Sequence, residues 1–334
     1  MPLTASLLIA CLLLALPTAG STAPWRLSKV QMVSRSSGWA LAATPRGSVV
    51  LRTTDGGADW RNVSPKGIWP LSSAQIAAND NYGIGLEGID CCALTGQTCW
   101  VAMINKSTQI IIERTHDGGR HWEQSQFANH TGYWLLLSLL DNRHGWVLTV
   151  SDMASGSTAK ELLGTKDGGR TWATVSEEIP NHIDPHGATF RNTSVGWLTA
   201  GYHGSDEMPF YRTDDGGRHW HVLELDTSAA LQSDERYENV YPPSFFGPKQ
   251  RDGLLPVQFR SLTSPTGLYR TRDGGNTWRM TALIPGLGRA DTFQFLSLKR
   301  GWIMEDAGGP TSRLLRTQDG GKRWHVVYPK QRKQ

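Results

Sequence analysis

Short runs of apolar and β-branched residues recur along the chain, separated by polar turns rich in glycine. Val49–Leu51 and Ile110–Ile112 are two such runs, and each leads into a segment of the form Thr-x-Asp-Gly-Gly. Beyond these turns polar and apolar residues alternate, as in His325–Tyr328. Runs of this length bounded by glycine are typical of β-strands, and two runs around a tight turn predict a β-hairpin.

The segment Thr-x-Asp-Gly-Gly-x-x-Trp occurs six times, at Thr53–Trp60, Thr115–Trp122, Thr165–Trp172, Thr213–Trp220, Thr271–Trp278 and Thr317–Trp324. In each Asp-Gly-Gly turn the aspartate can accept hydrogen bonds from nearby amides, and the glycines permit positive φ. These structural aspartates are Asp55, Asp117, Asp167, Asp215, Asp273 and Asp319. Turn formation alone explains them, so the sequence assigns them no metal or sugar.

A second element lies upstream of each turn, at Gly38-Trp39, Gly145-Trp146, Gly196-Trp197 and Gly301-Trp302, with Cys99-Trp100 and Gly253-Leu254 in the two remaining places. One unit then comprises strand A, a turn, strand B from Gly-Trp, a loop, strand C into the Asp-Gly-Gly turn, and strand D from the Trp. Repeats of about fifty residues built from four strands are typical of propeller blades. The chain is therefore predicted to be an all-β, six-bladed β-propeller of four-stranded antiparallel blades. Seven blades fit less well, because the long intervals 65–87 and 226–241 look like loops.

Composition agrees with this fold, since 36 glycines and 14 tryptophans in 334 residues favour many strands and tight turns. The first 23 residues carry no charged side chain, and the apolar run 7–16 is followed by Ser21–Ala23. This pattern predicts a signal peptide at 1–23, a propeller at 24–329 and a basic tail at 330–334, with an exported mature protein. The apolar run is too short for a transmembrane anchor, and lipidation at Cys11 stays open.

A formal net charge of +4 is too small to indicate nucleic acid binding. Propeller geometry places the A–B turns and the Asp-Gly-Gly turns on one face, where basic residues gather, and more acidic loops on the other. Arg143, Arg191 and Arg300 represent this basic face. The charge pattern favours an anionic partner, either a protein or an envelope polymer, bound by a monomer.

Three cysteines, Cys91, Cys92 and Cys99, remain after the predicted cleavage. Outside the cytoplasm one disulfide is plausible. Because neighbouring residues of a strand point to opposite faces, only one of Cys91 and Cys92 can meet Cys99 across a hairpin.

Histidines and carboxylates gather in two loops of the face opposite the Asp-Gly-Gly turns, at His182, Asp184, His186, His203, Asp206 and Glu207. Such residues can hold a divalent metal at the mouth of the central channel. An incidental polar turn explains them more simply, and the sequence implies no other cofactor.

The repeats resemble Asp-box (BNR-type) repeats, and the combination of Gly-Trp with Arg-Thr-x-Asp-Gly-Gly-x-x-Trp is most similar to the photosystem II stability and assembly factor family of exported propellers. That resemblance implies a non-catalytic scaffold that grips another protein. Sialidases share the box, but this chain has no Arg-Ile-Pro, and Tyr237-Glu238 lies in a predicted loop without an arginine set. The alternative is a glycan-active hydrolase or lyase using Trp69, Tyr82, Tyr237 and Tyr241 as aromatic platforms, with no catalytic residue identified.

Overall fold

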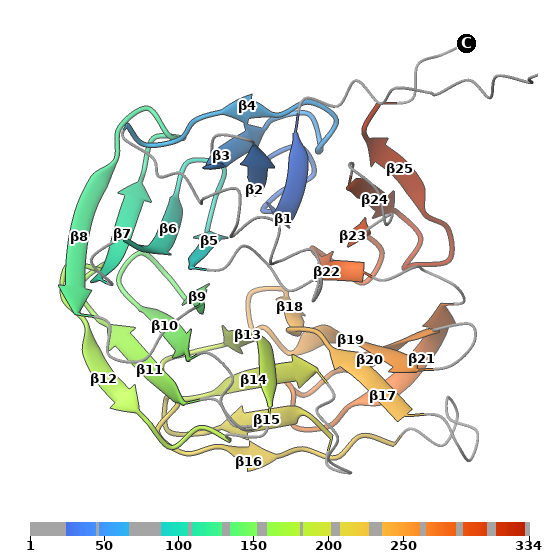
Figure 1. Cartoon of the computed structure of the whole chain (residues 1–334). Coiled ribbons are helices and arrows are strands. Elements are labelled where there is room, and N and C mark those ends of the chain that lie inside the picture. The colour runs from blue at the N-terminus through green and yellow to red at the C-terminus, as the bar shows by residue number, and fades with distance from the viewer. Residues whose placement is uncertain are drawn as a thin grey trace, which may run out of the picture.

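The computed structural model describes residues 25–44, 47–66, 88–105, 109–128, 134–151, 159–180, 183–201, 208–226, 236–260, 265–284, 290–305 and 312–330. These residues form β-strands joined by turns, and the sheets stand around a common axis as a disc (Figure 1). The predicted all-β propeller fold is confirmed. No helix in the described ranges has the length and apolar character needed to cross a membrane. The predicted signal peptide lies outside the described residues.

Four blades are separate four-stranded antiparallel sheets whose strands follow chain order. Blade 1 comprises β1 (Arg26–Met32), β2 (Gly38–Thr44), β3 (Gly47–Thr53) and β4 (Arg61–Asn62). Blade 2 comprises β5 (Ile89–Ala93), β6 (Cys99–Ile104), β7 (Gln109–Thr115) and β8 (Glu123–Ala128). Blade 3 comprises β9 (Trp134–Leu139), β10 (Gly145–Val150), β11 (Lys160–Thr165) and β12 (Ala173–Ser176). Blade 6 comprises β22 (Ala290–Phe295), β23 (Gly301–Glu305), β24 (Arg313–Thr317) and β25 (His325–Tyr328).

The two remaining repeats share one nine-stranded sheet. Blade 4 comprises β13 (Asp184–Phe190), β14 (Gly196–Gly201), β15 (Phe210–Thr213) and β16 (His221–Val222). Blade 5 comprises β17 (Arg236–Val240), β18 (Ser244–Phe246), β19 (Asp252–Arg260), β20 (Thr266–Thr271) and β21 (Arg279–Ile284). A single register pair, Gly201 with Asn239, joins the two blades.

Blade 5 departs from the predicted layout in its first strand. β17 and β18 both pair with β19, so together they take the place of strand A. The break between them contains Pro242 and Pro243, which have no N–H to donate to a sheet. Tyr237 and Glu238 therefore belong to a strand, and the prediction of a loop there was wrong.

The repeated residues fall at the predicted strand ends. Each strand C ends at the Thr of its turn, as β3 ends at Thr53 and β24 at Thr317. Each strand D begins one residue after the Trp rather than at it, as β4 begins at Arg61. The Trp side chain instead folds back over the turn, and Trp60 Nε1 donates to Gly57 O at 2.9 Å.

The core lies between blades. All six residues of β10 are buried, because a central strand is covered by a neighbouring blade on both sides. The tryptophans that open the second strands, Trp39, Trp100, Trp197 and Trp302, are among the largest fully buried or nearly fully buried side chains. The tryptophan of this element thus packs between blades, which explains why it recurs in five of the six blades, with Leu254 in its place in blade 5.

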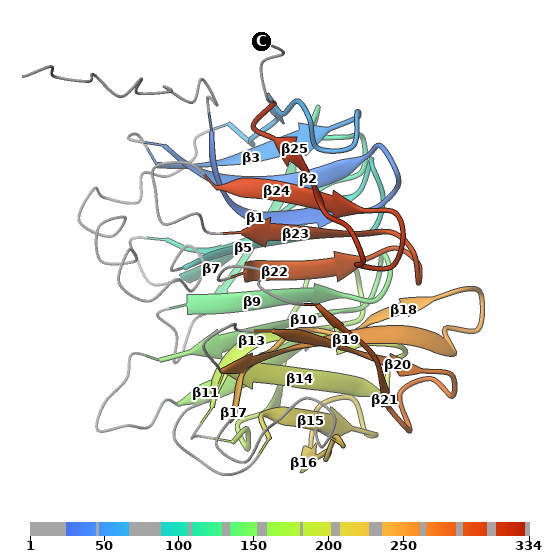
Figure 2. The same cartoon turned by 90° about the vertical axis from the view of Figure 1, so that its right-hand side faces the viewer.

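The ring closes through side chains, since among the described strands blades 1 and 6 exchange none. β1 lies beside β22 and β23 (Figure 2). The Gln294 side-chain amide pairs with the backbone of Met32, accepting from its N–H at 2.6 Å and donating to its carbonyl at 2.7 Å. Tyr328 Oη donates to Trp25 O at 2.8 Å. An apolar cluster containing Met32, Trp302 and Tyr328 fills the boundary.

The same kind of amide pairing joins blades 1 and 2. Gln31 accepts from Ala93 N at 2.7 Å and donates to Ala93 O at 3.2 Å. The first strands of successive blades also meet around the axis, as β5 and β9 do in Figure 1. There Asp90 Oδ2 accepts from Leu137 N at 2.8 Å, while Asp90 Oδ1 is ion-paired with Lys29. Polar side chains on the inner strands therefore connect blade to blade.

Candidate functional site

Each Asp-Gly-Gly turn is built by the aspartate and the threonine of its own repeat. In blade 1, Asp55 Oδ1 accepts from Thr53 Oγ1 at 2.8 Å and from the backbone N–H groups of Ala58 and Asp59 at 3.0 Å. Thr53 Oγ1 in turn accepts from Gly57 N at 3.1 Å. Both glycines have positive φ, 85° at Gly56 and 95° at Gly57, which explains why the turn requires them.

Hydrogen bonds of this kind hold the turn aspartates in their charged form. The pKa of the Asp117 carboxyl is well below its usual range, chiefly because the backbone N–H and then the ring of His121 hydrogen-bond to it. Burial raises the pKa of Asp273, but hydrogen bonds from the Thr277 side chain and backbone and from Thr271 outweigh it and lower that pKa to about 2. The turn aspartates are anions, and in every turn Oδ1 accepts a hydrogen bond from the threonine hydroxyl. In four turns Oδ2 is also hydrogen-bonded inside the turn, which leaves those four aspartates poor metal or sugar ligands.

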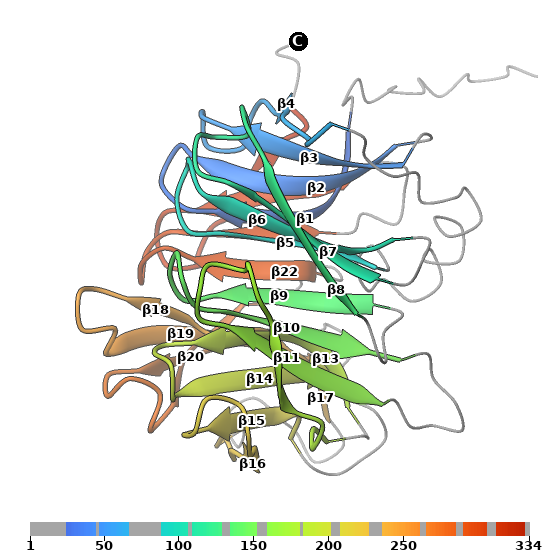
Figure 3. The ribbon, with the colours of Figure 1, turned by 90° about the vertical axis from the view of Figure 1, so that its left-hand side faces the viewer.

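The A–B turns and the Asp-Gly-Gly turns lie on the same face, as predicted. In every blade the first glycine of the turn donates its N–H to a carbonyl of the A–B turn of the same blade, at 2.7 to 2.9 Å. Gly56 donates to Ser36 O in blade 1, and Gly168 donates to Arg143 O in blade 3. Figures 2 and 3 show both kinds of turn on one side of the disc. We call the surface formed by these twelve turns the turn face.

Exposed cationic side chains gather on the turn face. They are Arg35, Arg120, Arg143, Lys166, Arg170, Arg218, Lys249, Arg251, Arg272, Lys299, Lys322 and Arg323. The exposed acids of the same turns are fewer, namely Asp55, Asp59, Asp141 and Asp214. Two of these four are tied to cations, since Asp59 is ion-paired with Lys330 and Asp214 with Arg212. The half-buried turn aspartates Asp117, Asp167, Asp215, Asp273 and Asp319 add five negative charges, so nine acids stand beside twelve exposed cations. The face keeps a smaller excess of positive charge.

The three arginines predicted to represent this face differ in the structure. Arg143 is exposed in the A–B turn of blade 3, where Asp141 accepts its backbone N–H at 2.7 Å. Arg300 is half-buried in the A–B turn of blade 6. Arg191 instead donates its guanidinium to the carbonyl of Gly274 in blade 5 and lies 6.0 Å from the ring centre of Trp197. Arg191 is thus committed to an interblade contact.

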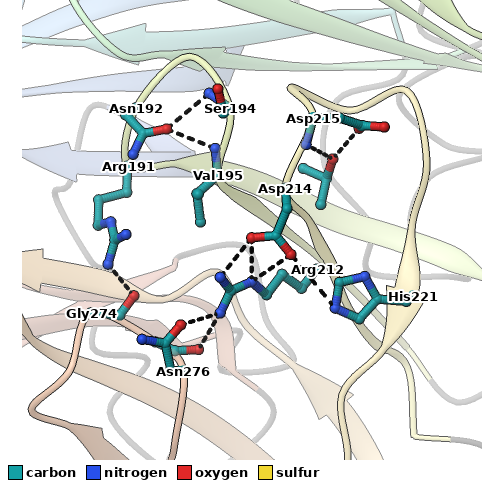
Figure 4. A network of polar contacts seen from close by, with 12 residues as sticks. Arg191, Asn192, Ser194, Val195, Arg212, Asp214, Asp215, His221, Gly274 and Asn276 are labelled. Carbon is teal, nitrogen blue, oxygen red and sulfur yellow. Dashed lines mark hydrogen bonds and ion pairs between the residues drawn. The ribbon is translucent and has the colours of Figure 1, made fainter.

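A polar network joins blades 4 and 5 at this point (Figure 4). Arg212 Nη1 donates to Asn276 Oδ1 at 2.6 Å, across the blade boundary. The same guanidinium binds Asp214, with Nη2 at 2.6 Å and Nε at 3.1 Å from Oδ1. His221 Nε2 lies 3.9 Å from the other oxygen of Asp214. The charges of Arg212 and Asp214 therefore largely neutralise each other, and Arg212 also binds the neighbouring turn.

The residue before the turn threonine has a role that the sequence reading missed. It is arginine in five repeats, at Arg52, Arg114, Arg212, Arg270 and Arg316. Arg114 Nη1 donates to Gly168 O of blade 3 at 2.5 Å, and Arg212 reaches the turn of blade 5. Arg270 instead pairs with Asp252 of its own blade, at 2.7 Å. The recurrence of arginine at one place in the repeat is visible in the sequence, whereas its partners appear only in the structure.

The predicted metal cluster is only partly within the described residues. His182, His203, Asp206 and Glu207 lie outside them, while Asp184 and His186 stand half-buried on β13. Asp184 faces the buried Lys160, whose pKa is lowered to about 8 by burial although the Asp184 charge raises it. The His186 ring lies 5.9 Å from the ring of Tyr241. Within the described ranges no three His, Cys, Asp or Glu side chains are arranged to hold a metal.

The three cysteines are free thiols in the structure. Cys91 and Cys99 are buried on the face of blade 2 that packs against blade 1. Cys92 packs against the cluster on the opposite face, between blades 2 and 3. The opposite orientation of Cys91 and Cys92, expected from the strand, is therefore present.

Comparison with known proteins supports the fold and leaves the family unassigned. No family model matches the chain, and no curated protein matches it. Among solved structures, "YCF48 bound to D1 peptide" is similar with a TM-score of 0.53 and 15% identity, over 92% of this chain and 82% of that one. A fungal lectin from Aleuria aurantia, described as a six-bladed β-propeller with a fucose recognition mode, has a TM-score of 0.55 and 12% identity over 87% and 89%. A GH74 xyloglucanase from Xanthomonas campestris reaches a TM-score of 0.47 and 15% identity, over 90% of this chain and 45% of that one, too low to support an argument.

Proposed function

We propose that this chain is a non-catalytic scaffold whose turn face binds an acidic segment of another protein. A protein-binding scaffold is what the resemblance of its repeats to the assembly factors implies. One observation carries the proposal: exposed arginines and lysines outnumber the carboxylates of the turn face, and both oxygens of most turn aspartates are already hydrogen-bonded inside the turn. Asp117, for example, accepts the backbone N–H groups of Arg120 and His121 at 3.0 Å. The side chain of Arg120 is left exposed.

The backbone of the turn face is held rigidly. The arginines stand on turns that are fixed twice, by the aspartate inside the turn and by the glycine N–H donated to the A–B turn. Because the backbone of each turn is fixed, binding must order the arginine and lysine side chains but not the loops that carry them, which lowers the entropic cost of binding. The D1 peptide in the YCF48 structure lies on a protein of the same general fold, and the Aleuria aurantia lectin of that fold recognises fucose, so the choice of a peptide rests on the charge of the turn face.

Binding of a labelled glutamate-rich peptide, measured by fluorescence anisotropy, tests the proposal. We expect binding that weakens as the salt concentration rises from about 0.05 to 0.3 M, because surface charges are screened over about 10 Å at 0.1 M. Replacing Arg143 and Arg300 by Glu is expected to lower the affinity about tenfold or more. Lys66→Glu is the control for a single charge reversal elsewhere, to be compared with Arg143→Glu alone, because Lys66 is exposed but follows β4 and lies in neither kind of turn.

If the parent and the double variant bind the peptide with equal affinity, the proposal that the turn face binds an acidic segment is refuted. Equal binding of the glutamine analogue of the peptide would show that charge does not drive the contact. A sulfated polysaccharide that binds more tightly than the peptide would favour the envelope polymer instead.

The glycan-active alternative stays a prediction. Trp69 and Tyr82 lie outside the described residues, and Tyr241 is only 3% exposed, with its hydroxyl 2.6 Å from Ala290 O. Tyr241 therefore cannot serve as an open platform. Hydrolysis of any member of a panel of plant and bacterial glycans by the purified protein would favour this alternative over the scaffold.

Export remains part of the proposal. A leader at 1–23 predicts a mature protein that begins near Pro24, outside the cytoplasm. N-terminal sequencing of protein recovered from the cell exterior or periplasm tests this. Light scattering of the same sample tests the expected monomer.

A further inference from the structure

The register of blade 2 sets Cys91 and Cys99 beside each other on adjacent strands. Cys91 on β5 is paired with Val101, and Cys99 on β6 is paired with Ala93, so the two cysteines are diagonal neighbours on one face of the hairpin. Both belong to the apolar cluster between blades 1 and 2, and both are fully buried. Cys92 is paired with Trp100 and projects to the other face.

The Cys91 and Cys99 side chains lie close enough on this face for each thiol to perturb the other. The Cys99 thiol also donates to Trp100 O at 3.5 Å. A disulfide needs Cα atoms within about 7 Å, a separation that diagonal neighbours of an antiparallel pair reach with an adjustment of the hairpin. We propose that Cys91 and Cys99 form a disulfide when the chain folds under oxidising conditions, and that Cys92 remains a thiol.

The timing follows from burial. Desolvation raises the pKa of Cys99 well above its ordinary value, so little reactive thiolate exists in the folded protein. The bond therefore forms while the blade 2 hairpin is still uncovered by blade 1. An oxidised small-molecule thiol such as glutathione disulfide supplies the oxidant. The two cysteine thiols lose two hydrogens, the S–S bond forms, and the glutathione disulfide is reduced to two glutathione molecules.

The disulfide would stabilise one turn of the turn face. The hairpin turn between β5 and β6, residues 94–98, belongs to that face and contacts two blades. Gln97 O accepts from Gly118 N at 2.9 Å within blade 2. Thr95 O accepts from Trp39 Nε1 of blade 1 at 2.9 Å. A disulfide at the base of this hairpin would hold the turn in register with both.

The test uses the full chain, which contains four cysteines. The reduced, unfolded chain is refolded with or without glutathione disulfide, then unfolded again and alkylated with iodoacetamide. In the oxidised sample we expect the peptide that contains Cys91, Cys92 and Cys99 to carry one alkyl group, on Cys92, and to be lighter by two hydrogens. The sample refolded without oxidant should carry three. The thermal midpoint of the oxidised protein should lie higher by a few degrees, roughly 3–6 °C.

Variants separate the possible pairings. Cys92→Ala should still form the bond, whereas Cys91→Ala and Cys99→Ala should leave every remaining thiol open to alkylation. Three alkyl groups in the oxidised parent would overturn the proposal without any variant. Bond formation in Cys91→Ala or Cys99→Ala, a glutathione adduct in place of the internal bond, or disulfide-linked dimers on a non-reducing gel would overturn it too.

Discussion

Replacing Gln294 by Met would remove the polar contact that closes the ring while keeping the side chain about the same size. The Gln294 amide makes two hydrogen bonds to the backbone of Met32, at 2.6 and 2.7 Å. Met32 is fully buried, so its N–H and carbonyl would be left without these partners and with little water to replace them. Each bond contributes about 1 kcal/mol net, and each orphaned group costs about 1–3 kcal/mol. Since some relaxation will occur, we expect a loss of about 2–4 kcal/mol in the free energy of unfolding.

Gln31→Met is the matched control, because Gln31 makes the same pair of bonds to Ala93 between blades 1 and 2. Urea unfolding followed by tryptophan fluorescence would measure both variants, with an unchanged slope indicating an unchanged unfolding reaction. Both should be destabilised by similar amounts, since each loses the same two bonds. A Gln294→Met protein with the midpoint and slope of the parent would refute the account of ring closure given above.

Three further predictions concern the turn face. The turn aspartates have lower pKa values in the folded protein than their ordinary value of about 4. The stability that they contribute is therefore complete above about pH 4 and is lost as the pH falls toward about 2, the pKa of Asp273. A thermal midpoint that stays constant between about pH 5 and 2.5, measured by circular dichroism at about 0.1 M salt, would contradict this. Gly57→Ala should lower the free energy of unfolding by about 2–4 kcal/mol, because φ is 95° and the added Cβ would lie 2.6 Å from Leu314 Cδ2. Gly247→Ala should lower it by only about 1 kcal/mol, because φ is also positive there but no atom lies within 4 Å of the added Cβ. Equal urea midpoints for the two variants would argue against this difference. Arg191→Gln should lower stability by about 1–3 kcal/mol through its lost interblade contact, while Arg143→Gln should stay within about 0.5 kcal/mol of the parent; the reverse order in differential scanning fluorimetry would show that the two arginines have been assigned the wrong roles.

Local chemistry explains why the turns were predictable. Asp55, Thr53 and the two following glycines interact with one another inside a single turn, so their spacing in the sequence carries the whole of their geometry. The same holds for the alternation of Cys91 and Cys92, which a strand imposes on neighbours. The first strand of blade 5 was less predictable, because Pro242 and Pro243 split it into two short pieces and hid the β pattern.

Interactions between blades could not be read from the sequence. Arg143 and Arg191 occupy equivalent turns and look alike in the sequence, yet only Arg191 has the Gly274 carbonyl of the next blade within reach. Asp184 and His186 were grouped with the adjacent His182 and with a loop expected to lie near them, while the structure places Asp184 near Lys160 and sets His186 beside Tyr241. Such contacts depend on the rotation from one blade to the next, which no local pattern encodes.

The sequence by itself determined the repeating unit, the order of its strands and the turn that ends each third strand, because those features rest on hydrogen bonds within a few residues. Only the tertiary structure decided which charged side chains of the turn face are exposed and which form contacts between blades. It also decided that Cys91, rather than Cys92, shares a face of the hairpin with Cys99, and that Gln294 and Tyr328 close the ring. The physical reason is distance along the chain: these partners meet only after the blades have packed around one axis.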